Sequence, residues 1–194
     1  MARREPVETH DEGDGWTIEI HQDDETRDLD EVIPEGVHVQ TWHRRMRLGE
    51  TIAKPDDTEE LAALEDAITA EHPDALVCAL YMYDHGGYTF ALRPFSCRWD
   101  SGQVGVIWTD SADFPDKRAA LESVVSEMAA IAEGRVYGYI VRSPEGEHVD
   151  SCWGFIGADP SEPGWMLDEA RAVLASEREG RKAAERMERE SFAL

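Results

Sequence analysis

The run from residue 75 to residue 83 constrains the fold of this chain most, because it is apolar on both faces of an extended strand. Such a strand must be covered from both sides, so we expect it inside a sheet. A Gly-Gly pair follows at 86–87, and paired glycines can take the positive φ angles that reverse a chain. Residues 88–93 then alternate between the two faces of a returning strand. The pattern predicts a hairpin whose tip carries Asp84 and His85.

Further periodicities predict the remaining elements. Alternation or apolar runs of strand length indicate strands over residues 16–21, 37–42, 103–109, 135–141 and 147–155. Helical spacing of apolar residues, with capping residues before it, indicates helices over residues 55–72 and 115–134 and from about residue 163 onward. This order predicts an α+β fold, a single domain with a mostly antiparallel sheet of about six or seven strands covered by two or three helices.

The length of 194 residues suits one compact domain with ragged ends. Residues 1–15 are acidic and poor in apolar groups, so we expect a mobile arm. Residues 16–175 form the expected domain. Residues 176–194 are mostly Glu, Arg and Ala, which predicts a charged helical tail.

The net charge of −23 and the scarcity of Lys indicate either the environment or the kind of partner to which the chain is adapted. Acids spread along the whole sequence are typical of a halophilic cytosol, where molar salt reduces the Debye length to about 3 Å. Mimicry of DNA by an acidic surface is the alternative interpretation. The start of the chain is charged and the longest apolar stretch is shorter than the roughly 18 residues of a spanning helix. We therefore expect a soluble, cytoplasmic protein with no signal peptide and no membrane partner.

One stretch collects the groups that a nucleophilic enzyme would need. Cys97 lies beside Arg98, whose charge could activate a thiol, and His85 in the neighbouring hairpin tip could act as its base. Asp84 or Asp100 could orient that imidazole. The alternative is that the Cys97 thiol is packed or hydrogen-bonded and has no catalytic role.

Cys97 and His85 are also residue types that bind zinc. Cys97, Cys152, His85 and His148 have the ligand types of a zinc site, but their spacing does not follow the short Cys and His repeats of such sites. We therefore predict no metal site. Three cysteines without any sign of secretion do not predict disulfides. The sequence leaves the question of a cofactor open.

Arg residues and aromatic residues surround the same region. A basic concentration in this acidic chain could receive a phosphate or carboxylate or simply form salt bridges; it consists of Arg44, Arg45, Arg47, Arg93 and Arg98. Trp99 and Trp153, mixed with Arg, are typical of interaction surfaces.

Several phrases resemble a family of small proteins encoded by phages, plasmids and integrative elements, a family without an assigned activity. They are Ile18-Glu19-Ile20, His43-Arg44-Arg45 before Leu48-Gly49, Tyr83-Asp84-His85, Pro94-Phe95-Ser96-Cys97, Trp99-Asp100-Ser101-Gly102-Gln103-Val104-Gly105 and Asp150-Ser151-Cys152-Trp153-Gly154-Phe155.

The resemblance covers roughly residues 16–157 and implies a viral or mobile-element origin and a shared site. The implied site consists of His43, Arg44, Arg45, Asp84, His85, Cys97, Trp99, Asp100, Ser101, Gln103, Asp150, Cys152 and Trp153. The chain departs from the family pattern with Gly86 in place of Ser and Arg98 in place of Pro, and it lacks an early Trp-Asp-Asn-Leu-Gly phrase.

Three functions follow as hypotheses. The leading one is an accessory protein of a virus or mobile element that binds a host or replication protein through the surface around Cys97, Trp99 and Trp153. The second is a small hydrolase or transferase that uses Cys97 with His85. The third is an acidic inhibitor that mimics DNA. Direct binding of nucleic acid is not expected from so acidic a chain, and the sequence leaves the partner and the oligomeric state open.

Overall fold

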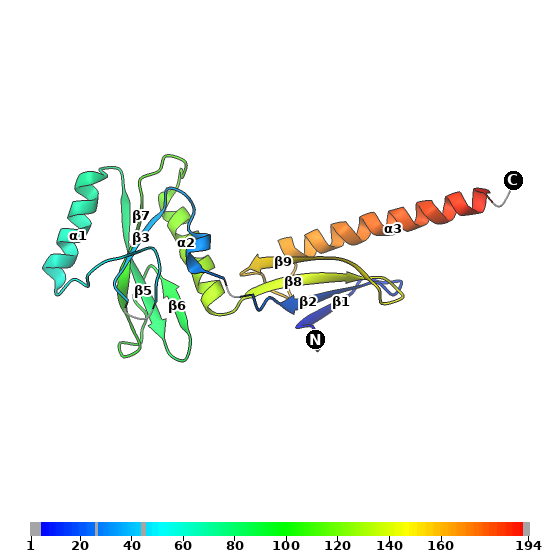
Figure 1. Cartoon of the computed structure of the whole chain (residues 1–194), viewed down its shortest axis with the longest axis horizontal. Helices are drawn as coiled ribbons and strands as arrows, with labels where there is room; N and C mark the ends of the chain where they lie inside the picture. Colours follow the sequence, from blue (N-terminus) through cyan, green and yellow to red (C-terminus); the bar gives the residue numbers. More distant parts are fainter. Residues whose placement is uncertain (1–4, 26, 44–45, 192–194) are drawn as a thin grey trace. The chain divides into compact units, whose positions relative to one another are not determined.

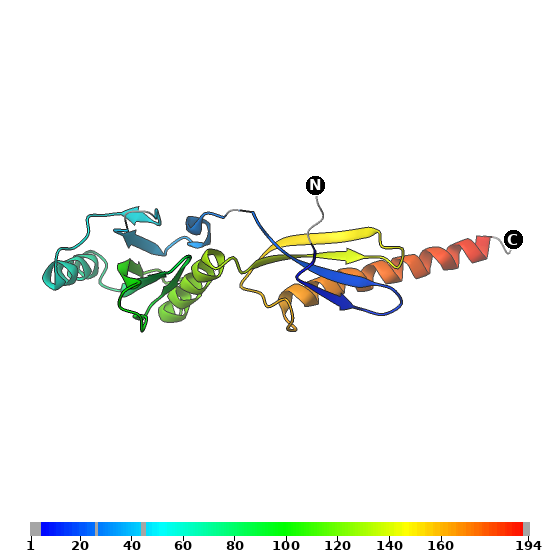
Figure 2. The ribbon, with the colours of Figure 1, turned by 90° about the horizontal axis from the view of Figure 1, so that it is seen from below.

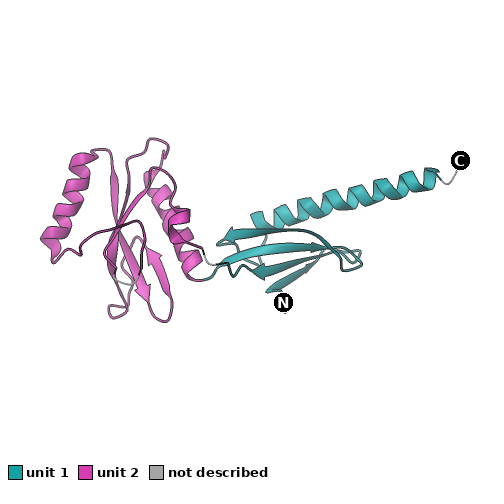
Figure 3. Cartoon of the chain, in the orientation of Figure 1, with its two compact units in different colours: residues 1–25, 134–194 teal, residues 26–133 magenta. Residues whose placement is uncertain are grey.

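The chain divides into two compact units in the computed structural model, which describes residues 5–25, 27–43 and 46–191 (Figure 3). Unit 1 contains the residues up to Glu25 and those from Gly134 onward, and unit 2 contains residues 26–133. The Gln22 side chain donates to the Gly134 carbonyl at 2.7 Å, and the Asp23 N–H donates to the Val136 carbonyl at 2.9 Å. Unit 2 is therefore an insertion whose two connections to unit 1 start side by side.

The α+β class and the mostly antiparallel pairing are confirmed. The described residues form nine strands in two sheets of five and four strands, whereas one sheet of six or seven strands was expected. The expected domain of residues 16–175 thus contains both compact units. No helix within the described ranges is both long enough and apolar enough to cross a bilayer.

Unit 2 is built on the five-stranded sheet. Its elements are the 3-10 helix η1 (Leu29–Val32), the strands β3 (His38–Thr41), β4 (Glu50–Thr51), β5 (Leu76–Asp84), β6 (Tyr88–Ala91) and β7 (Ser101–Thr109), and the helices α1 (Thr58–Glu71) and α2 (Lys117–Ala132). The strand order is β4-β3-β7-β5-β6, with β3 and β4 parallel and the other pairs antiparallel. The apolar run of the sequence is β5, and it lies inside the sheet as expected.

Both faces of this sheet are covered. Figure 1 shows α1 and α2 on opposite sides of the strands. The face toward α2 carries Leu80 and Ile107, which pack with Leu121 and Met128 of the helix. The other face packs Trp108 and its neighbours against α1. Coverage on both sides is why β5 and β7 contain so few polar residues.

Unit 1 is a four-stranded antiparallel sheet with one long helix. Its elements are β1 (Glu8–Asp11), β2 (Thr17–Gln22), β8 (Val136–Arg142), β9 (His148–Ile156) and α3 (Trp165–Ser191), and the strand order is β1-β2-β8-β9. The helix lies along one face of the sheet (Figure 2). Its residues Met166, Leu167, Ala170 and Leu174 pack on that face.

The predicted mobile arm is partly wrong, because residues 8–11 are the edge strand β1. The physical reason lies at the far end of the chain. Arg178 of α3 donates from Nη2 to the Glu12 and Gly13 carbonyls at 2.7 Å each, and its guanidinium stands 5.7 Å from the centre of the buried Trp16 ring. These contacts fix the β1–β2 turn. The predicted tail is helical through Ser191.

Candidate functional site

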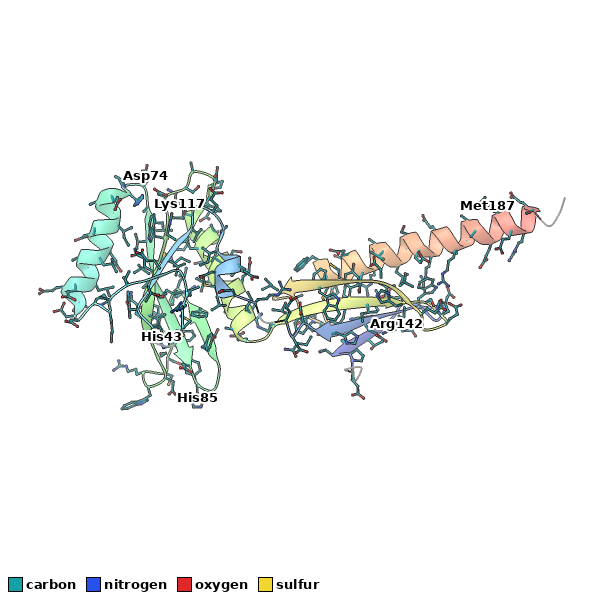
Figure 4. The ribbon with its side chains drawn as sticks, in the orientation of Figure 1. His43, Asp74, His85, Lys117, Arg142 and Met187 are labelled. Carbon is teal, nitrogen blue, oxygen red and sulfur yellow. The ribbon has the colours of Figure 1, made fainter. Side chains whose placement is uncertain are left out.

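The predicted catalytic residues meet at one end of unit 2, around the β5–β6 turn and the start of β7. Figure 4 shows His85 at the tip of the hairpin. Gly86 takes a φ of 77°, which a side chain would disfavour, and the His85 N–H donates to the Gly87 carbonyl at 2.9 Å. The Asp84 N–H donates to the Asp100 carbonyl at 2.7 Å, and this bond ties the tip to the loop that precedes β7.

Asp100 joins the proposed nucleophile to the proposed base. Its Oδ2 accepts the Cys97 thiol at 3.5 Å and lies 3.4 Å from His85 Nδ1. The Ser101 hydroxyl donates to the Cys97 carbonyl and closes the loop on its other side. We call Cys97, His85 and Asp100 the Asp100 cluster. It is open to solvent, since the side chains of His85 and Asp100 are 71% and 38% exposed.

The order of these groups differs from that of a nucleophile, base and orienting acid. In that order the imidazole stands between the thiol and the carboxylate, whereas here the carboxylate stands between the thiol and the imidazole. Within the part of the chain that the structure describes, no hydrogen bond joins His85 to Cys97. The contacts present are those of a hydrogen-bonded thiol, with an imidazole oriented through Nδ1.

Trp99 is the most exposed large apolar residue in the described chain. Its side chain is 95% exposed, although the loop around it is held by hydrogen bonds at Cys97, Asp100 and Ser101. Arg98 beside it is also exposed. An exposed indole on a loop held by hydrogen bonds is available to a partner, and Trp is enriched among the residues that dominate the binding energy of interfaces.

Gln103 and His43 are two further predicted binding residues in unit 2. The Gln103 amide donates to the Gly105 carbonyl at 3.2 Å within its own strand, and the Gln103 carbonyl accepts from the Trp42 indole at 3.3 Å. His43 is half-buried, and its Nδ1 has no hydrogen-bond partner among the described groups (Figure 4). Arg44 and Arg45 lie outside the described residues.

Asp150, Cys152 and Trp153 lie on β9 in unit 1. The predicted site residues are therefore divided between the two units, and neither unit by itself contains the single surface that was expected. Cys152 is half-buried on the side of β9 that faces α3; burial and the nearby Glu169 carboxylate raise the pKa of its thiol. A raised pKa disfavours the thiolate that nucleophilic chemistry needs.

The third cysteine, Cys78, is more deeply buried than Cys97 and Cys152. Cys78 is buried in the core of unit 2 as expected, and burial raises the pKa of its thiol. All three cysteines are free. Among the residues that the structure describes, no three His, Cys, Asp or Glu side chains converge as metal ligands do.

Sequence reasoning missed a charged cluster on the open face of the unit 1 sheet. Arg142 Nε lies 2.6 Å from Glu19 Oε1, and Glu19 Oε2 lies 3.3 Å from His21 Nε2. The Trp153 ring borders it, 6.2 Å from the His21 ring. The available signal was that Glu19 and His21 occupy the polar positions of one strand, but that pattern is also the pattern of an ordinary solvent face.

A second missed cluster lies on the α1 side of the unit 2 sheet. The buried Trp108 ring stacks on His38 with centroids 4.0 Å apart and contacts His72 at 4.5 Å. His72 Nδ1 lies 2.8 Å from Asp110 Oδ2, and this hydrogen bond lowers the pKa of the Asp110 carboxyl. The cluster packs the end of α1 against β7.

The comparisons with known proteins leave the chain without a match: no protein-family model, no curated protein and no solved structure matches it.

Proposed function

We propose that the chain is an accessory protein of a virus or mobile element that binds a host or replication protein through the Trp99 surface of unit 2. This surface consists of Trp99, Arg98 and His85. The observation that carries the proposal is the 95% exposure of Trp99 on a loop whose backbone is held by hydrogen bonds.

The energetics favour a contact role for this residue. Trp buries about 150–250 Å² in an interface, which is worth roughly 4–6 kcal/mol at about 25 cal/mol per Å² before the costs of association. Those costs are reduced here, because the Asp84 N–H to Asp100 carbonyl bond and the Ser101 hydroxyl bond already order the loop.

The charge of the chain indicates which surface such a partner presents. A net charge of −23 attracts basic proteins and repels nucleic-acid phosphates. Because long-range attraction is screened by salt while apolar contact is not, a Trp99-centred complex should persist at high salt.

The test compares two exposed tryptophans. Wild type, Trp99→Ala and Trp165→Ala are immobilised, incubated with host lysate at high salt, and the retained proteins are quantified by mass spectrometry. Trp165 is 59% exposed on α3 of unit 1 and serves as the matched control. We expect Trp99→Ala to lose a defined protein by about 30-fold or more, as for a central interface residue, while Trp165→Ala retains it. Equal retention by Trp99→Ala, or retention of only background by wild type, contradicts the proposal.

A second candidate, a Cys-dependent hydrolase or transferase, is favoured by the contact of Asp100 with both Cys97 and His85. It requires His85 to turn toward the thiol and accept its proton. Brief alkylation of the native protein, read for each cysteine by peptide mass, tests it. The candidate expects Cys97 to label fastest, and His85→Ala to slow that labelling. Labelling of Cys97 that His85→Ala leaves unchanged would contradict it.

A further inference from the structure

The four-stranded sheet of unit 1 has one face covered by α3 and one open face. Residues alternate between the faces along each strand, so Ile18 and Ile20 of β2 point toward the helix while Glu19 and His21 point to the open side. Arg142 of β8 is on the same side, because it contacts Glu19. This face therefore carries buried charge where a sheet exposed to water usually carries mobile polar side chains.

Glu19, His21 and Arg142 are held in one arrangement. Their side chains are only 20%, 13% and 11% exposed, and Glu19 contacts both partners. The Arg142 hydrogen bond, ahead of the weaker one from His21, lowers the pKa of the Glu19 carboxyl. The charge of Arg142 is therefore balanced inside the cluster by an ionised Glu19.

Trp153 lies against Gly138 beside this cluster. A Cβ on Gly138 would come within 2.3 Å of the Trp153 ring carbon Cε3, so only glycine allows the ring to lie against the strand. The residue remains 46% exposed. Gly138 thus positions an indole with part of its surface open to solvent.

These groups line a pocket of about 500 Å³ that Glu5, Val7 and Asp24 complete. Since Glu19 balances Arg142, the Glu5 carboxylate adds a further negative charge among the described residues of the lining. An anion would have to displace Glu19 from Arg142 and face Glu5. A cation gains from these two carboxylates and from the π face of Trp153.

We propose that this pocket binds the guanidinium or ammonium group of a basic segment on a protein partner. The cation lies over the indole of Trp153, with the carboxylates of Glu5 and Glu19 within its electrostatic reach. Arg142 and His21 act as positioning residues that hold Glu19. The site lies in unit 1, whereas the Trp99 surface lies in unit 2.

The test uses the full ¹⁵N-labelled chain and N-acetyl-arginine methylamide as the probe, with N-acetyl-glutamate methylamide and N-acetyl-norleucine methylamide as anionic and neutral comparators. The Trp153 indole N–H resonance is identified by its loss in Trp153→Leu. We expect a saturable shift of this resonance with the arginine probe alone. Trp153→Leu should weaken binding by about 2- to 30-fold, measured on the backbone amides of β2 and β8.

Two further variants keep the result decisive. Glu5→Gln should also weaken binding and leaves the sheet untouched, because Glu5 precedes β1. Trp165→Leu, an exposed indole on the helix side of the same unit, should leave the affinity unchanged. The absence of a saturable shift, an equal response to the glutamate probe, or unchanged affinity in both Trp153→Leu and Glu5→Gln would overturn the proposal.

Discussion

At the scale of single residues, the contact between His72 and Asp110 joins two elements that are distant in the sequence. His72 ends α1, Asp110 follows β7, and their contact at 2.8 Å holds these two elements together beside the buried Trp108. Neither residue stands out in the sequence, because a lone His before a proline and an Asp after a strand are common loop residues.

The His72–Asp110 pair predicts a dependence of stability on acid. The pKa of Asp110 is lowered in the folded state by the His72 hydrogen bond, so the pair stabilises the fold above the unfolded pKa of about 3.9. That stability is lost as the pH falls through the lower folded pKa. We therefore expect Asp110→Asn to reduce the free energy of unfolding near neutral pH and to differ progressively less from wild type in this acid range.

Urea unfolding at a series of pH values measures this difference. Asp113→Asn removes a neighbouring exposed acid and is the matched control, with no such convergence expected. A difference between Asp110→Asn and wild type that stays constant from neutral to strongly acid pH would refute the assignment.

At the scale of elements, helix α1 begins where its capping residues dictate. The Asp57 carboxylate accepts from the Glu59 and Glu60 N–H groups at 2.9 and 3.0 Å, and the Glu60 side chain accepts from the Asp56 N–H at 2.7 Å. The two bonds to Asp57 satisfy N–H groups that the first turn of the helix leaves without partners, and the Glu60 bond holds the residue before the cap. They explain why this start could be predicted from neighbouring residues alone.

Removal of the cap should destabilise unit 2 by a defined amount. Asp57→Ala is expected to lower the free energy of unfolding by about 0.5–2 kcal/mol. Asp66→Ala, in the exposed middle of the same helix, should be neutral or slightly stabilising, because Ala has the higher helix propensity. Denaturant unfolding followed by tryptophan fluorescence reports on both variants, since Trp108 lies under α1. Equal effects of the two substitutions would show that the cap contributes nothing.

At the scale of the whole molecule, the chain consists of one unit inserted into another. Each unit has its own apolar core, built from residues of that unit alone. The points at which the chain leaves and re-enters unit 1 are bridged by the Gln22–Gly134 and Asp23–Val136 hydrogen bonds. A separate core and adjacent connections are the features of an insertion that can be removed.

We therefore expect residues 26–133 to fold as a separate fragment. We also expect unit 1 to fold when Glu25 is joined to Gly134 by a short Gly-Ser linker. The ¹⁵N–¹H spectra of both fragments, compared with the spectrum of the full chain, measure this directly. Dispersed spectra that overlay the corresponding resonances of the full chain are the expected result. A collapsed spectrum for either fragment would show that its core is insufficient alone.

Much of the candidate site follows from local pattern. The hairpin with Asp84 and His85 at its tip was predicted from an apolar run and a Gly-Gly pair, and its proximity to the loop of Cys97 follows from chain order. The position of Asp100 between the thiol and the imidazole could not be predicted, because side-chain placement in a loop depends on hydrogen bonds such as that of Ser101.

The sequence by itself determined the α+β class, the two hairpins and the helix starts, because each depends on residues only a few positions apart. Only the tertiary structure decided the division into two sheets. Alternation shows that β2 and β8 are strands, but their pairing depends on Ile18 and Val141 burying one face together under α3. It also decided that residues 8–11 form the ordered strand β1, because the distant Arg178 binds the turn that follows this strand. Interactions between distant parts of the chain leave no periodic signal, so packing alone reveals them.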